Sequence, residues 1–101
     1  MFGNMEEKQQ EMRKRLAEIM VEGSAGDGAV VVKANANREI INIAIQKDAF
    51  DPNDLEQLED LLVVAINRAL DDAAVVEANE TENLLKDMMP PGLGDLRDLF
   101  G

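Results

Sequence analysis

Several residue types that catalysis and ligand binding commonly use are missing from this 101-residue chain. It contains no cysteine, histidine, tryptophan or tyrosine, and its only aromatic residues are three phenylalanines. Without cysteine there is no disulfide framework and no thiolate chemistry, and without histidine there is no imidazole metal ligand. Few aromatic residues disfavour a small-molecule pocket and stacking on single-stranded bases. We therefore expect no enzyme activity, no cofactor and no small-molecule substrate.

The chain also lacks the long apolar runs and the leader-like start that membrane insertion or export requires. No run approaches the ~20 apolar residues that cross a bilayer, and residues 1–8 are too polar for a secretory signal. We therefore expect a cytoplasmic protein with no membrane partner.

Negative charge dominates the composition, but only in the second half of the chain. The net charge is −11. Residues 1–47 carry seven basic and seven acidic side chains, whereas residues 48–101 carry three basic and fourteen acidic ones. Proteins that neutralise phosphates normally present a basic surface. If this protein binds nucleic acid, we expect the first half to make the contacts.

Residues 4–20 are predicted to form the first helix, because they contain good helix formers and neither glycine nor proline. Their apolar residues recur at intervals of four and three, with Gln9 filling one position, which is typical of a coiled-coil seam. The seam consists of Met5, Met12, Leu16 and Ile19. So narrow a seam needs a partner helix, and we interpret it as part of a dimer interface. Glu11 lies four residues before Arg15, so these two side chains are expected to pair.

Two strands are predicted in the middle of the chain. Residues 29–35 and 38–46 are rich in β-branched residues, and the segment Asn35-Ala36-Asn37-Arg38 tolerates left-handed backbone conformations. We therefore predict a β-hairpin. The glycine-rich segment 22–28 that precedes it is either a flexible link or a short edge strand.

The second strand of the hairpin alternates in a way that predicts its two faces. One face is expected to carry Ile41, Ile43 and Ile45, and the other Ile40 and Asn42. Two strands alone are marginally stable in water, so this apolar hairpin needs further packing partners.

A second helix is predicted over residues 52–88. Asp51 is expected as its N-cap, Pro52 in its first turn and Asp54 shortly after. Its apolar stripe consists of Leu55, Leu58, Leu62, Ala65, Ala69, Ala73 and Val76. This helix would be about 55 Å long, whereas a compact domain of this size has a radius of gyration of ~13 Å. The helix must therefore protrude, which again favours a dimer.

Several short motifs give the chain a family resemblance. It begins Met1-Phe2-Gly3, its second helix carries Leu58-Glu59-Asp60-Leu61 followed by Ala65-Ile66-Asn67-Arg68-Ala69, and Pro90-Pro91-Gly92-Leu93 lies near its end. In order and spacing, over nearly the whole chain, these features resemble the YbaB/EbfC family of nucleoid-associated proteins.

The resemblance implies both a fold and a function. The fold class is α/β of the α+β type: an α-β-β-β-α protomer whose short antiparallel sheet, with residues 18–26 as its first strand, is flanked by two long helices. Residues 1–89 would form a single domain and residues 90–101 a flexible tail. The family further implies an intertwined homodimer with projecting helical arms. Members bind duplex DNA in the bacterial nucleoid, influence gene expression and have no catalytic residues.

The candidate DNA-binding residues are the cations of the first helix, Lys8, Arg13, Lys14 and Arg15. They would contact phosphates, and a dimer would double their number. The alternative is an ordinary solvated helix face of mixed charge. Asn67 lies in the middle of a helix, where asparagine is unfavourable, so we interpret it as a buried hydrogen-bonding residue that fixes the dimer register.

The acidic residues support a second hypothesis. Adjacent acids such as Glu59 and Asp60 splay apart on a helix, so neither paired catalytic carboxylates nor a metal site is expected. The projecting end of the second helix carries Glu77, Glu80, Glu82 and Asp87, with only Lys86 among them as a counter-charge. The two hypotheses are a DNA-binding homodimer with little sequence preference, and an acidic adaptor that holds a basic protein.

Overall fold

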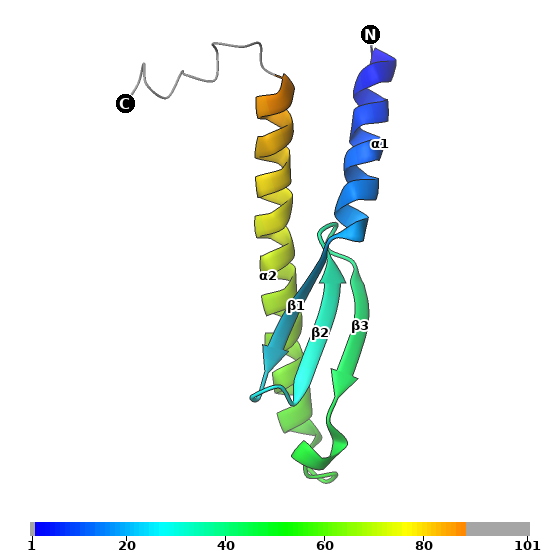
Figure 1. Cartoon of the computed structure of the whole chain (residues 1–101). Coiled ribbons are helices and arrows are strands. Elements are labelled where there is room, and N and C mark those ends of the chain that lie inside the picture. The colour runs from blue at the N-terminus through cyan, green and yellow to red at the C-terminus, as the bar shows by residue number, and fades with distance from the viewer. Residues whose placement is uncertain (1, 89–101) are drawn as a thin grey trace, which may run out of the picture.

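The computed structural model of the chain describes the backbone of residues 2–88 and the side chains of residues 5–87. Its elements are α1 (Phe2–Glu18), β1 (Met20–Ala25), β2 (Val30–Asn35), β3 (Ile40–Ile45), the 3-10 helix η1 (Lys47–Ala49) and α2 (Leu55–Met88). The predicted α-β-β-β-α order and mixed α+β class are confirmed (Figure 1). The expected tail, residues 90–101, lies outside the described residues.

The three strands form one antiparallel sheet in the order β1-β2-β3. Most of the glycine-rich segment therefore belongs to an edge strand, as one of the two alternatives expected. A tight turn joins β1 to β2, in which the Ala29 amide donates to the Gly26 carbonyl at 3.1 Å. Gly26, Asp27 and Gly28 all have positive φ angles, which glycine adopts without steric cost.

The predicted alternation of β3 is wrong at its beginning, because the strand contains a register shift. Ile43 and Ile45 lie opposite Val32 and Val30, but Ala34 lies opposite Ile40 rather than Ile41. An extra residue in one strand moves the following side chains to the other face. Ile40 therefore shares a face with Ile43 and Ile45.

Small residues bring α2 unusually close to the sheet. Ala65, Ala69 and Ala73 on α2 are completely buried, and a Cβ atom on Gly23 of β1 would lie 2.3 Å from the Ala65 carbonyl oxygen. Val30 and Val32 fill the centre of the core. α2 packs mainly over β1 and β2, and β3 remains exposed along its whole length.

Both helices differ at their ends from the predicted boundaries. α1 ends at Glu18, two residues early, and the chain turns directly into β1. α2 begins at Leu55, because Asp54 and not Asp51 is its N-cap: the Asp54 carboxylate accepts a hydrogen bond from the Gln57 amide at 3.2 Å. The Asp51 carboxylate instead accepts from the Asn53 amide in the preceding turn. Leu55 is 63% exposed and lies outside the core.

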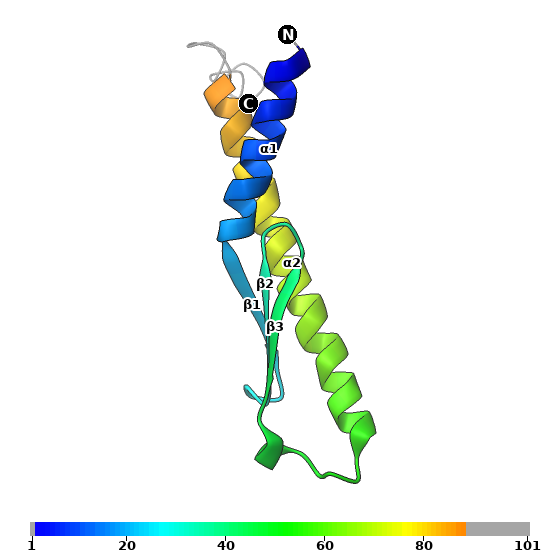
Figure 2. The same cartoon turned by 90° about the vertical axis from the view of Figure 1, so that its right-hand side faces the viewer.

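The molecule is an elongated, thin body with two projecting helices. Its extents are 61 × 35 × 15 Å and its radius of gyration is 19.0 Å, well above the ~13 Å of a compact domain of this size. The sheet covers only the first half of α2, while α1 and the second half of α2 extend together beyond the sheet (Figures 1 and 2). We call α1 and the second half of α2 the arm.

Candidate nucleic-acid interface

The base of the arm is built by the turn between β2 and β3. The Ala36 amide lies 3.1 Å from the Leu16 carbonyl oxygen and 3.0 Å from that of Ile19, so it satisfies carbonyls that the end of α1 leaves without helical partners. The Asn37 side-chain amide also donates to the Arg13 carbonyl at 2.8 Å. These bonds fix the direction in which α1 leaves the sheet.

The turn itself is organised by one buried polar residue. Asn35 is 3% exposed, and its side-chain oxygen accepts hydrogen bonds from the backbone amides of Asn37 at 3.0 Å and Glu39 at 3.1 Å. Its amide group donates to the Glu39 carboxylate at 3.0 Å. The last loop residue, Arg38, has a φ of +65°, as expected for a three-residue hairpin loop that ends in a left-handed residue.

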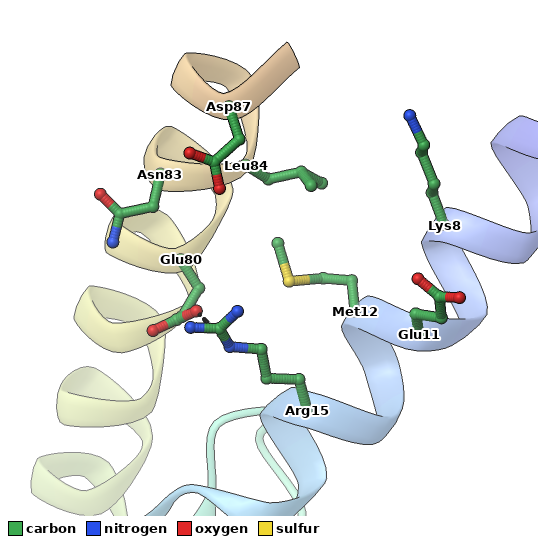
Figure 3. A pocket seen from close by; sticks show the side chains of 8 residues that line it. All are labelled: Lys8, Glu11, Met12, Arg15, Glu80, Asn83, Leu84 and Asp87. Carbon is green, nitrogen blue, oxygen red and sulfur yellow. Dashed lines mark ion pairs between the residues drawn. The ribbon is translucent and has the colours of Figure 1, made fainter.

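The four predicted DNA-binding cations lie on the arm, but not on one common surface. Lys8 and Arg15 are two helical turns apart and line the hollow between α1 and α2, together with Met12 and Leu84 (Figure 3). Arg13 lines a different hollow, toward the β2–β3 turn and Arg38. Lys14 is exposed and lines neither hollow.

Arg15 pairs across the arm and not along its own helix. Its Nε lies 2.9 Å from the Glu80 Oε2 of α2, and Figure 3 shows the two side chains reaching toward one another. The expected pair with Glu11 does not form, because Arg15 turns toward α2. A second pair joins the turn to α2, with Arg38 Nη2 at 3.2 Å from Glu77 Oε2.

The predicted dimer-interface residues differ widely in exposure. Leu16 is 4% exposed and so is already buried inside the protomer, while Met12 and Ile19 are half-buried. Met5 is 59% exposed. Asn67 is exposed on the side of α2 away from the sheet, so any burial of its side chain requires a second molecule.

Three polar residues at the base of the arm were not predicted as a group: Arg38, Glu77 and Glu80. A signal for two of them was present, since Glu77 and Glu80 are three residues apart and must share a helix face. Their partners come from other elements, so no local pattern could identify them. Arg38 could have been noticed, because it follows two asparagines in a turn where glycine is usual.

The described part of the chain contains neither a membrane-spanning helix nor a metal-binding cluster. Residues 2–88 contain no helix that is long and apolar enough to span a membrane. Among the same residues, no group of three or more acids lies close enough together to hold a metal ion.

Sequence comparisons find relatives over most of the chain. The model of the YbaB/EbfC DNA-binding family matches residues 1–88. A nucleoid-associated protein of Chloroflexus aggregans is 40% identical over 100 residues, which cover 99% of this chain and 92% of that protein. Nucleoid-associated protein YaaK of Bacillus subtilis is 40% identical over 77 residues, covering 76% and 72%.

A solved structure shares the fold. The crystal structure of an uncharacterized protein of Helicobacter pylori superposes with a TM-score of 0.62 at 18% identity, and the match covers 87% of this chain and 98% of that one. The fold and site thus define a small α+β protein with a charged helical arm. The chain belongs to the YbaB/EbfC DNA-binding family.

Proposed function

We propose that this protein binds duplex DNA as a homodimer, with little sequence preference, and helps to organise the bacterial nucleoid and the expression of its genes. The observation that carries the proposal is the family match over residues 1–88. A location in the cytoplasm, on the nucleoid, follows from the proposal.

The uncovered strand β3 supports the dimer. A helix is ~10 Å wide and neighbouring strands are ~4.8 Å apart, so one helix covers about two strands. Here α2 covers β1 and β2, and leaves Ile40, Ile43 and Ile45 on its own side of the sheet about 40% exposed. A second copy that packs there would bury these isoleucines, and by twofold symmetry its own as well.

The cations of α1 support phosphate contact. Within residues 5–87, the side chains of Lys8, Arg13 and Lys14 form none of the ion pairs, so they are open to a partner from outside the protomer. A dimer would present them twice. Such contacts hold the sugar-phosphate backbone and carry no base information, which accounts for the proposed lack of sequence preference.

Replacing Arg13 and Lys14 by alanine together is expected to weaken binding to labelled duplex DNA by about tenfold, equally for unrelated sequences. The slope of log affinity against log salt should flatten by about 0.9 for each phosphate that the variant no longer neutralises. Lys33→Ala with Lys47→Ala removes the same charge from the sheet region and should have a much smaller effect. Equal reductions of affinity in the two double variants would contradict the assignment to α1.

The exposed acids of α2 favour a second candidate function. Asp60, Asp71 and Asp72 lie on exposed positions of a helix whose cations are only Arg68 and Lys86. Such a surface would hold a basic protein and repel DNA. Absence of any shift of duplex DNA at low salt, with the folded dimer present, would exclude direct DNA binding and favour this adaptor role.

A further inference from the structure

Two arginines that face the base of the arm are held by two glutamates of α2. Arg15 comes from α1 and Arg38 from the β2–β3 turn, while Glu77 and Glu80 are neighbours on one face of α2. Arg38 Nη2 lies 3.2 Å from one carboxylate oxygen of Glu77 and 3.4 Å from the other. The second half of α2 thus supplies the counter-charges for one cation of α1 and one of the β2–β3 turn.

The left-handed backbone conformation of Arg38 indicates that its side chain has a function. Its φ of +65° falls in the left-handed region, where a residue with a Cβ is strained by about 1 kcal/mol or more relative to glycine. Glycine would close the same loop without that strain. A strained residue that carries a charged side chain is a candidate for a functional contact.

A carboxylate that binds an arginine side chain occupies the position in which a DNA phosphate would bind. Both anions present two oxygens in a plane to the same N–H donors. The arginine side chains remain 67% and 57% exposed, so a DNA strand can reach them without unfolding the arm. The glutamate side chains are less exposed, at 18% for Glu80 and 35% for Glu77, but each guanidinium stays mostly in water. Ion pairs that water reaches in this way are weak, and a phosphate can therefore displace the glutamates.

We propose that Glu77 and Glu80 are internal competitors of DNA phosphate that hold Arg38 and Arg15 until duplex DNA displaces them. The inference rests on the proposed DNA binding, and it adds Arg38 to the DNA-contacting residues. Glu77 and Glu80 would thereby lower the affinity for DNA. Without them, each protomer would carry two more unpaired cations.

The test compares the Glu77→Gln/Glu80→Gln variant with the wild type in titrations of labelled duplex DNA across a range of salt concentrations. Glutamine keeps the size of each side chain and removes its charge. The variant is expected to bind about tenfold more tightly, since each freed exposed pair contributes up to about fivefold. Its slope of log affinity against log salt should stay close to the wild-type value, because the same phosphates are engaged once DNA has displaced the glutamates.

A matched control separates local competition from overall repulsion. Glu56→Gln with Glu59→Gln removes the same charge from the start of α2, where both side chains are exposed and far from the arm. A second control introduces Glu77→Gln/Glu80→Gln into an Arg15→Gln/Arg38→Gln variant. There the two glutamine substitutions should no longer increase the affinity for DNA. Circular dichroism verifies that every variant is folded.

Each outcome decides the inference. Tighter binding by the variant than by its charge-matched control supports it where the wild type also binds. Binding by the variant alone would mean that DNA cannot displace the glutamates and would overturn it. Equal binding by both variants overturns it and leaves the proposed function intact if the wild type binds. If neither wild type nor Glu77→Gln/Glu80→Gln binds at low salt, the inference and the proposed function both fail. A gain that persists without the arginines would also overturn it.

Discussion

Replacing Gly23 by alanine is expected to lower the free energy of unfolding by about 3 kcal/mol, near the upper end of overpacking costs. The added Cβ would lie 2.3 Å from both the Ala65 carbonyl oxygen and the Ala69 amide nitrogen. These are backbone atoms of α2, so no side chain can turn aside and the helix must move away from the sheet. That movement would open the close contact between β1 and α2 and weaken the burial of Ala65 and Ala69.

Chemical denaturation at a fixed protein concentration measures this destabilisation, since the stability of a dimer depends on concentration. Gly28→Ala is the matched control. Gly28 has a φ of +89°, but its new Cβ would meet nothing within 4 Å, so only the conformational strain of about 1–2 kcal/mol is expected. If Gly23→Ala were no worse than Gly28→Ala, the close approach of β1 and α2 would not be what stabilises the fold.

Replacing Ile43 by glutamate is expected to raise the dissociation constant of the proposed dimer by at least about 100-fold. Ile43 lies in the middle of the uncovered face of β3 and is 41% exposed in the protomer. A carboxylate placed under a second copy would be buried without a partner, and twofold symmetry would repeat this cost at the second site. Because the side chain stays open to water in the monomer, the protomer should remain folded.

Sedimentation equilibrium measures the dissociation constant, and circular dichroism verifies the fold. Asn42→Glu provides the control on the neighbouring residue. Asn42 lies opposite Lys33 on the other face of the sheet, where a glutamate gains a cross-strand counter-charge. We expect this variant to remain dimeric. A wild-type dissociation constant for Ile43→Glu would exclude the β3 face as the interface.

The elements that are regular and local could be predicted from the sequence. The long helix follows from an apolar stripe of period 3.6, and the hairpin follows from β-branched runs around an asparagine-rich turn. The arm was predictable from length alone, since a helix of about 50 Å cannot be enclosed by a domain this small. The family motifs supplied the order of the elements.

Most of the details that failed depend on contacts between distant segments, whereas the N-cap of α2 depends on a local turn. The register shift in β3 changes which isoleucines share a face, and strand pairing alone decides where an extra residue is accommodated. The N-cap of α2 is Asp54 and not the predicted Asp51. Both residues are suitable N-caps, and only the geometry of the turn selects one of them. Arg15 pairs with Glu80 and not with the predicted Glu11, because α2 runs beside α1.

Composition and periodicity by themselves determined that this is a small α+β protein that contains no cysteine or histidine and carries seven of its ten cations in residues 1–47. These properties follow from residue counts and from periodic patterns along the chain, and they do not depend on which segments pack against one another. Only the tertiary structure decided that the four candidate cations are divided among different surfaces and that Glu77 and Glu80 hold two arginines. Ion pairs and exposed faces arise between elements far apart in sequence, and the folded arrangement alone brings them together.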